Sequence, residues 1–180
     1  MDQAEEPYSK EASDFRSKTM RFSETIMPHI LNMYASHATP HDFEIYAQDA
    51  TFEDPLMTAI GIKQIKSAFY SLPKVFKESR MVEYSVQEHE VSPGKHEITI
   101  DNKQYYKFLG KDVDMISLIK LYIENGKVIR HEDWWDKKPP RSRETEKIRM
   151  LGRVMEAMRR GAMLATHAMM GFGKDPEQKN

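Results

Sequence analysis

The sequence has no cysteine among its 180 residues, and this absence excludes several kinds of chemistry. Without thiols there can be no disulfide, no thiolate nucleophile and no cysteine-ligated zinc site. The 27 basic and 28 acidic side chains nearly cancel, so we expect no overall field that would attract nucleic acid. A chain without disulfides suits a reducing compartment, and we therefore expect a cytoplasmic protein.

Long apolar runs are also missing. No segment approaches the roughly 20 apolar residues that a membrane-spanning helix needs, so we expect no integral membrane segment. Residues 1–6 are acidic and do not resemble a secretory signal. Residues 1–14 carry no clear periodicity and are predicted to be a disordered N-terminus.

Motifs that bind cofactors are absent as well. The sequence has no Gly-rich phosphate loop, no nucleophile elbow and no basic-aromatic strand motif. The histidines are scattered, and His37 and His41 are separated by Pro40, which breaks the helix that would align them. We therefore expect no metal site, no cofactor and no nucleic-acid partner.

The first half of the chain carries helical patterns. Apolar residues recur at helical spacing as far as Met33, and Pro28 inside this pattern predicts a kink or a break near Met27. Thr39 and Pro40 predict the start of a short second helix over residues 41–46. A third helix is predicted from Ile62 to Tyr70, and the pattern allows it to continue past Pro73 to Phe76.

Residues 80–136 change to strand patterns. Polar and apolar residues alternate over 81–86 and 97–101, and residues 101–103 and 124–127 carry turn signals. Asn125 and Gly126 predict a hairpin that joins residues 115–123 to 128–136. Helices followed by antiparallel strands predict an α+β fold, with helices on one face of a curved sheet and a ligand cavity between the layers.

The C-terminal segment has a different pattern. Residues 137–141 predict an exposed, proline-stiffened linker. Beyond it, Ile148, Leu151, Met155, Met158, Ala162, Ala165 and Met169 recur at three- and four-residue spacing, which predicts an amphipathic helix. We expect this helix, residues 143–170, to pack on its own domain or on a partner subunit. Its basic residues leave open a second reading, peripheral contact with a membrane surface.

The segment from Ala50 to Pro55 contains the candidate base. Alternation along an extended segment sends Glu53 and Asp54 to opposite faces, so one of these acids should point inward. A carboxylate held against apolar surface is costly to ionise, which makes it a candidate base with a raised pKa. The alternative is structural: an Asp-Pro turn or a cap for the helix region that begins at Gly61.

The last predicted strand contains a second set of candidates. Its alternation places Ile129, His131, Asp133 and Trp135 on one face, where mixed polar and aromatic side chains suit a cavity wall. His131 and Asp133 are then about 6–7 Å apart along the strand. A histidine beside a carboxylate is typical of general acid–base catalysis, and it is also a common structural hydrogen bond.

Two of these segments resemble a known group of proteins. Ala50–Pro55 followed by Gly61 and its helix, together with the hairpin over residues 124–136, is similar to the NTF2-like superfamily and its SnoaL-like polyketide cyclase and ketosteroid isomerase branches. Residues 22–137 are also similar to plant proteins of this group. The resemblance implies a cone-shaped domain over residues 15–138, in which a curved antiparallel sheet wraps around N-terminal helices. Residues 139–180 lie outside it as a linker, the amphipathic helix and a tail.

The resemblance also implies roles for single residues. Asp54 matches the aspartate with which ketosteroid isomerases remove a proton beside a ketone and return it two carbons away. The oxyanion tyrosine of that family falls near Ile30, with Tyr34 one turn later on the same face. Its second aspartate falls near Ser117 or Leu118, so His131, Asp133 or Tyr106 would have to hold the oxyanion. In SnoaL-like cyclases a late-strand acid carries the chemistry, which points to Asp133.

We therefore predict a cofactor-independent double-bond isomerase acting on a small apolar terpenoid or steroid ketone, and we expect a homodimer. The predicted catalytic residues are Asp54, His131, Asp133 and Tyr34, and the predicted ligand-binding residues are Trp135, Tyr106, Phe69, Phe52 and Ile30. One alternative is a non-catalytic ligand-binding or dimeric interaction module that uses the outer sheet face near Trp134 and helix 143–170. Another is a SnoaL-like aldol cyclase.

Overall fold

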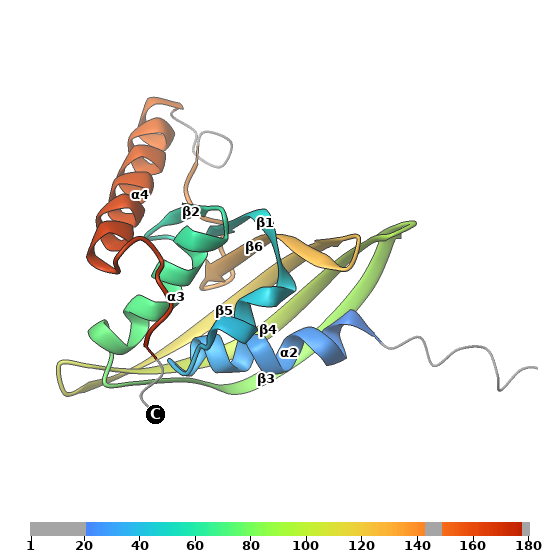
Figure 1. The fold of residues 1–180 in the computed structure, drawn as a ribbon, viewed down its shortest axis with the longest axis horizontal. Coiled ribbons are helices and arrows are strands. Elements are labelled where there is room, and N and C mark those ends of the chain that lie inside the picture. Colours follow the sequence, from blue (N-terminus) through green and yellow to red (C-terminus); the bar gives the residue numbers. More distant parts are fainter. Residues whose placement is uncertain (1–20, 143–148, 178–180) are drawn as a thin grey trace, which may run out of the picture.

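A strongly curved sheet wraps around two helices in the computed structural model, which describes residues 21–142 and 149–177 (Figure 1). The helical elements are α2 (Phe22–Tyr34), the 3₁₀ helix η1 (Pro40–Ile45), α3 (Ile62–Val75) and α4 (Arg149–Met169). The strands are β1 (Tyr46–Glu53), β2 (Thr58–Ile60), β3 (Glu78–Ser92), β4 (Lys95–Phe108), β5 (Lys111–Glu124) and β6 (Lys127–Trp135). The predicted N-terminal disorder over residues 1–14 lies outside the described residues.

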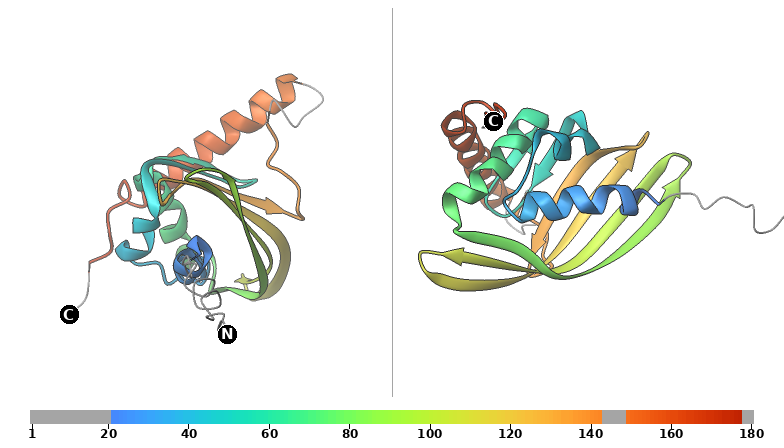
Figure 2. Two further views of the ribbon diagram at one scale, coloured as in Figure 1. Left: turned by 90° about the vertical axis from the view of Figure 1, so that its right-hand side faces the viewer. Right: turned by 60° about the horizontal axis from the view of Figure 1, so that its bottom comes forward.

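The sheet has the strand order β2-β1-β6-β5-β4-β3, and every neighbouring pair except β1 and β6 is antiparallel. Figure 2 shows the sheet curling so that α2 and α3 lie in its concave face. Inward side chains of the long strands, such as Ile98, Ile100, Ile119 and Leu121, are fully buried against these helices. The predicted α+β fold with a curved antiparallel sheet around N-terminal helices is confirmed.

One of the two predicted turns is confirmed and the other is wrong. Asn125 and Gly126 both adopt positive φ and join β5 to β6, because a two-residue hairpin loop of this type needs left-handed residues. Residues 101–103, in contrast, lie inside β4, where Asn102 is buried and its side chain bonds the carbonyl of Ile100. Pairing with strands on both sides overrides the local turn preference there, and the true turn contains Gly94.

The helix predictions need smaller corrections. α2 continues through Pro28 without the predicted break, since a proline removes a single backbone donor from a helix that is packed on the sheet. α3 likewise extends past Pro73. The predicted helix over residues 41–46 is a 3₁₀ helix that ends at Ile45, so Tyr46 already belongs to β1. The Asp42 carboxylate accepts the Thr39 amide and hydroxyl and fixes the start of this element.

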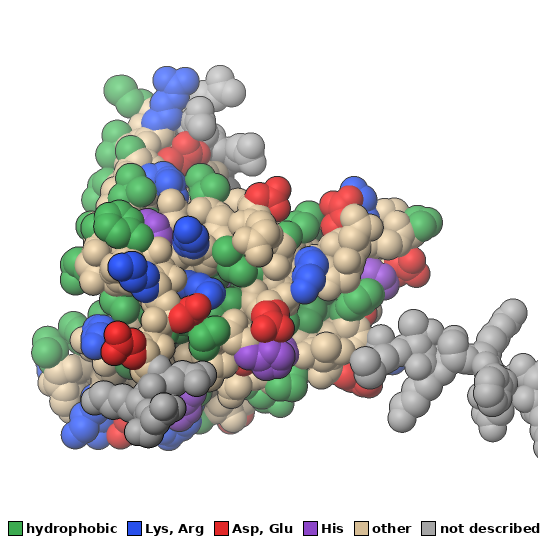
Figure 3. Space-filling view, in the orientation of Figure 1, with side chains coloured by type: hydrophobic (Ala, Val, Ile, Leu, Met, Phe, Trp, Pro, Cys, Tyr) green, Lys and Arg blue, Asp and Glu red, His purple; other side chains and the backbone are tan. Residues whose placement is uncertain are grey.

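The C-terminal helix α4 packs on the outside of the cone, against α3 and β2 (Figure 1). The helix thus packs on its own domain, one of the two expected arrangements, but the described part of its apolar seam is not the contact face, because Met155 is half-buried and Met158, Ala162, Ala165 and Met169 are exposed. The buried face consists of other positions, including Arg159 and Met163. Figure 3 shows hydrophobic side chains gathered along the outer edge of α4.

No helix in the described ranges is long and apolar enough to cross a membrane. Residues 143–148, the first turns of the predicted amphipathic helix, lie outside these ranges.

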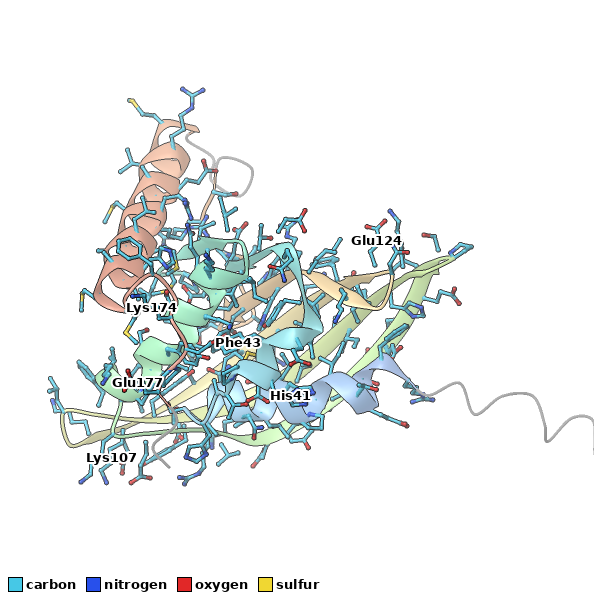
Figure 4. All side chains as sticks on the ribbon, viewed as in Figure 1. His41, Phe43, Lys107, Glu124, Lys174 and Glu177 are labelled. Atoms are coloured by element: carbon cyan, nitrogen blue, oxygen red, sulfur yellow. The ribbon has the colours of Figure 1, made fainter. Side chains whose placement is uncertain are left out.

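The segment after α4 returns to α3, and Figure 4 labels Lys174 and Glu177 on this tail. Asp175 accepts hydrogen bonds from Lys66 at 2.6 Å and from the Tyr70 hydroxyl at 2.9 Å. His167, at the end of α4, pairs with the Ser67 hydroxyl at 2.7 Å. These polar contacts connect the extension to α3, the helix that covers the cavity described below.

Candidate functional site

A cavity of about 340 Å³ lies between the concave face of the sheet, the second half of α3 and the turn after β1. Most of the side chains that line it are apolar, which suits a hydrophobic ligand. The apolar lining comprises Phe52, Leu56, Met57, Ala68, Phe69, Leu72, Val75, Phe76, Phe108, Val113, Met115 and Trp135. The polar lining consists of Tyr34, Asp54, Ser71, Tyr106 and Asp133.

Asp54 directly follows β1 and lines the cavity, whereas Glu53 faces α4 on the other side of the strand. The alternation of β1 produces this division, since Phe52 is buried next to the cavity and the following side chain must point outward. The Asp54 Oδ1 atom accepts two hydrogen bonds of 2.7 Å from the amides of Leu56 and Met57. Both bonds go to Oδ1, so Oδ2 is the oxygen that can exchange a proton with a ligand.

These bonds identify the structural role of Asp54, which is to close the turn between β1 and β2. The backbone N–H of Asp54 also donates to the Met57 carbonyl at 3.1 Å. Asp54 does not cap α3, the helix that follows Gly61. The side-chain bond at the start of that helix is made by Gln64, whose Oε1 accepts the Ile60 amide. Asp54 therefore closes its own turn, and its carboxyl still faces the cavity.

Asp133 lies at the inner end of the cavity, on β6, and is almost completely buried. Its Oδ2 accepts the Tyr34 hydroxyl at 3.0 Å, and its Oδ1 accepts the Ser117 hydroxyl. The sequence predicted His131, Asp133 and Trp135 on one face, together with Ile129. Ile129 is instead exposed, because a bulge in β6 pairs Val128 with Ile123 and Arg130 with Tyr122 and leaves Ile129 between them.

A chain of hydrogen bonds runs behind this acid into the core. His131 is fully buried, with Nδ1 2.7 Å from the Tyr46 hydroxyl and Nε2 3.2 Å from the Tyr34 hydroxyl. Burial lowers the pKa of His131 to about 3, so the ring is neutral. Since Tyr34 donates to Asp133, the consistent assignment has Tyr46 donating to Nδ1 and Nε2–H donating to Tyr34. His131 thus orients Tyr34 from behind.

The two carboxyl groups of the site have raised pKa values. Burial is the main cause for Asp54, whose pKa rises to about 7, with a further contribution from the negative charge of Asp133. The two amide hydrogen bonds and Arg159 act in the opposite direction. Burial also raises the pKa of Asp133, although Ser117 and Tyr34 stabilise its charged form. Two acids that disfavour each other's charge hold one proton between them most readily.

Two buried donors near Asp133 lack a well-formed hydrogen bond among the described residues. They are Gln104 Nε2 and Trp135 Nε1. Both lie close enough to the Asp133 carboxyl to lower its pKa. Tyr106 is fixed differently, since its hydroxyl donates to Gln104 Oε1. A ligand oxygen at this end of the cavity would give the indole N–H an acceptor.

The structure brings most of the predicted residues together. Tyr34, Asp54, Asp133, Trp135, Tyr106, Phe69 and Phe52 all line the cavity. Ile30 and His131 are fully buried in the core and are not among the described residues that line it. For Ile30 the reason is that α2 turns this side chain toward the centre of the core, one turn before Tyr34.

Sequence reasoning missed Gln104, Tyr46 and Arg159. Gln104 is a polar residue at an inward position of β4, and such a residue in an otherwise apolar register is a signal that could have identified it. Tyr46 was assigned to a helix, which hid its inward direction. Arg159 carried no local signal, because its partners lie more than a hundred positions away in the chain.

Metal binding has no support in the described part of the chain, where no group of three or more His, Asp or Glu side chains could hold an ion. The donors that line the cavity are instead phenols, an indole and carboxyl groups that share hydrogen bonds.

The fold matches that of known structures. An NTF2-like protein from Anabaena variabilis is 12% identical, with a TM-score of 0.56 over 67% of this chain and 91% of that chain. An NTF2-like protein from Burkholderia pseudomallei is 15% identical, with a TM-score of 0.54 over 66% and 93%. A hexachlorocyclohexane dehydrochlorinase is 13% identical, with a TM-score of 0.56 over 63% and 82%.

No family model and no curated protein matches the sequence. At the low identities of the structural matches, the likeness establishes the NTF2-like fold, as the sequence resemblance implied, and the reaction has to be argued from the cavity.

Proposed function

We propose that this chain, which has the NTF2-like fold, is a cofactor-independent isomerase that moves a C=C bond into conjugation with the ketone of a small apolar terpenoid or steroid. The observation that carries the proposal is the pair of acids that line one apolar cavity, the half-buried Asp54 and the buried Asp133. A base with a pKa of about 7 is half ionised near neutral pH, where it can both remove and return a proton.

The reaction follows from the arrangement of these two acids. The Asp54 carboxylate takes a proton from the carbon between the ketone and the C=C bond, and the electron pair moves onto the ketone oxygen as a dienolate. Neutral Asp133 and the Trp135 N–H donate hydrogen bonds to that oxygen. Protonated Asp54 then delivers its proton to the far carbon of the former double bond, which restores the ketone and the carboxylate.

Tyr34, the last residue of α2, supports this arrangement. Its hydroxyl donates to Asp133 and is itself held by the neutral His131. The role we propose for His131 is therefore to fix Tyr34, and a direct proton transfer from His131 to a ligand has no support from its burial. The aromatic residues Phe52, Phe69 and Tyr106 would enclose the hydrocarbon part of the ligand.

The decisive experiment replaces Asp54 by Asn and measures isomerisation of a β,γ-unsaturated cyclic ketone by the absorbance of the conjugated product. Loss of the base should lower kcat by about 10²–10⁴-fold. Asp49→Asn, at an exposed position of the same strand, is the matched control and should keep full activity. Unchanged turnover in folded Asp54→Asn would exclude Asp54 as the base. If turnover were retained in Asp54→Asn and lost in Asp133→Asn, the alternative aldol cyclase with Asp133 as its acid would be favoured.

A second candidate function, a non-catalytic interaction module that docks through its C-terminal helix, is favoured by one observation. The outward face of α4 carries exposed apolar side chains, including Met150, Val154, Met158 and Leu164. Such a face is typical of a docking surface, and we propose peripheral contact with a membrane as its use. Co-sedimentation with anionic liposomes tests this use. Equal pelleting of the wild type and Met158→Glu would contradict it.

We further propose a cytoplasmic homodimer that forms through the outer sheet face. On that face the Lys120 ammonium lies 5.1 Å from the Trp134 ring and 5.5 Å from the Tyr122 ring, a mixed aromatic and cationic surface. Aromatic and cationic side chains of this kind are enriched at protein interfaces. Sedimentation velocity decides the question, since a concentration-independent monomer would contradict the dimer.

A further inference from the structure

The turn that carries Asp54 is held from outside by two consecutive arginines of α4. Arg159 Nη1 donates to Glu53 Oε2 at 3.2 Å and to the backbone carbonyl of Asp54 at 3.4 Å. Arg160 Nη1 donates to the carbonyl of Thr58 at 2.5 Å and to Gln64 Oε1 at 2.8 Å. One helix therefore holds both strands of the β1–β2 hairpin, one on each side of the Asp54 turn.

Arg159 is an expensive residue to place here. Its side chain is 4% exposed, and its ion-pair partner Glu53 is 26% exposed. Its Nε has no hydrogen-bond partner among the described residues. A desolvated guanidinium persists where nearby negative groups compensate for the lost water. Glu53 is one such group, and the Asp54 carboxylate at the next position is close enough for its pKa to respond to Arg159.

We propose that Arg159 is a positioning residue for the candidate base, fixing the Asp54 turn through the backbone and favouring its carboxylate through its buried positive charge. The inference rests on the proposed function for its catalytic meaning. Its structural content, a link between α4 and Asp54, stands on the two hydrogen bonds of Arg159. The C-terminal extension then takes part in the site although it packs outside the cone.

The charges that face Asp54 make the sign of this effect testable. Asp133 on β6 raises the pKa of Asp54, and Tyr34 on α2 and Tyr106 on β4 line the same cavity. Glu53 on β1 adds a second negative charge on the α4 side. Arg159 is a cation working against these groups and against burial. Removing it should leave a carboxyl that holds its proton to higher pH.

The experiment measures the titration of Asp54 itself, by the ¹³C carboxyl shift that disappears in Asp54→Asn. Arg159→Gln should raise the midpoint by about one pH unit, the size of shift that a nearby buried charge produces. Glu53→Gln should lower it, because the positive charge of Arg159 is then unbalanced. Arg153→Gln, which removes the same charge from an exposed position of α4, should leave the midpoint unchanged. The pH profile of kcat/KM should move with each midpoint.

Three outcomes would overturn the inference: an unchanged midpoint in folded Arg159→Gln, shifts of the same sign in Arg159→Gln and Glu53→Gln, or an equal shift in Arg153→Gln. If Arg159→Gln does not fold, Glu53→Gln decides by its sign, with Arg159→Lys keeping the charge. The proposed function fails separately. A wild type without isomerase activity whose Asp54 midpoint still responds to Arg159 would refute the reaction and retain the positioning role.

Discussion

Asp54 has a structural role in a turn and also presents its carboxyl to the cavity. Its Oδ1 closes a turn through two amide bonds, while its carboxyl faces an apolar cavity that raises its pKa to about 7. The turn bonds by themselves would lower the pKa, so the burial of the group outweighs them. An aspartate with a purely structural role in a turn would keep its carboxylate in water and would have no desolvation cost. The position of Asp54 therefore costs stability, and this cost can be measured.

The cost predicts an unusual dependence of stability on pH. The folded-state pKa of Asp54, about 7, lies above the unfolded value of about 3.9, so between these values the folded protein binds a proton that the unfolded chain has released. The contribution of Asp54 is fully present below pH 4 and is lost as the pH rises through 7. A shift of three units corresponds to about 4 kcal/mol, and for a half-buried group we expect about 2 kcal/mol.

Urea unfolding of the wild type and of Asp54→Asn at pH 5 and pH 8 tests this. The difference in the free energy of unfolding between the two proteins should change by about 1.3 kcal/mol, because about a third of the contribution is already lost at pH 5, and Asp54→Asn should be relatively more stable at pH 8. Asp49→Asn should show no such change, since that side chain is exposed. A difference that is independent of pH would mean that Asp54 ionises as freely in the fold as in the unfolded chain.

The residues of the site could be predicted to an uneven extent. Asp133 and Trp135 follow from alternation, since each lies at an inward position of a strand. For Asp54, alternation predicted only that either Glu53 or Asp54 points inward, and the family resemblance made the choice. Ile129 could not be assigned correctly, because a bulge changes the count between two residues without any sign in the sequence. Arg159 could not be connected to Asp54 either, since only the packing of α4 brings them together.

At the scale of elements, α4 illustrates what periodicity can predict. The spacing of apolar residues predicted the existence of a helix, and it indicated an apolar face. It did not indicate which face would contact the domain. The face of α4 that contacts the domain contains Arg159, Arg160 and Met163. The two arginines donate hydrogen bonds to a carbonyl and a carboxylate of the β1–β2 hairpin, which need donors. Polar complementarity therefore decided the orientation of α4.

The tail after α4 depends on one glycine. Gly173 has φ +72°, and a Cβ placed on it would lie 2.2 Å from the backbone carbonyl oxygen of Lys63. Gly173→Ala should therefore detach the tail from α3 and break the contacts of Asp175 with Lys66 and Tyr70, at a cost of about 2 kcal/mol or more. Limited proteolysis or hydrogen exchange of residues 171–177 measures this docking.

A matched control separates the clash from the backbone strain. Gly94 has a similar φ of +75°, and a Cβ added there would meet nothing within 4 Å, so Gly94→Ala should cost only about 1 kcal/mol, from strain alone. Equal effects of the two substitutions, or full protection of the tail in Gly173→Ala, would show that the contact with Lys63 does not hold the tail.

At the scale of the whole molecule, the sheet and helices form a container whose chemistry is concentrated at one end. The antiparallel ladder and the hairpin at Asn125 could be predicted, because local alternation and turn chemistry specify them. The curvature that creates the cavity could not, since it results from the long pairing of β3, β4 and β5 around α2 and α3. An enzyme and a non-catalytic carrier would both need such a cavity, so ligand binding has to be measured separately from turnover.

Ligand binding should raise the thermal stability of the protein whether or not it is an enzyme. A conjugated cyclic enone at about 100 times its Kd should stabilise the fold by about 2.7 kcal/mol, which raises Tm by about 5–10 °C for a chain of this length. Asp54→Asn should keep this rise, because Asp54 is proposed to move protons and the apolar walls remain. Met115→Trp should abolish it by filling the cavity that Met115 lines.

Ile116→Trp is the control, since Ile116 is the next residue of β5 and its side chain is exposed on the opposite face. It should retain the full rise in Tm. If Met115→Trp and Ile116→Trp responded alike, the ligand would bind outside the cavity. If Asp54→Asn lost both the rise in Tm and turnover, Asp54 would be a group that binds the ligand. If Asp54→Asn lost turnover and kept the rise in Tm, the protein would be an isomerase and not a carrier.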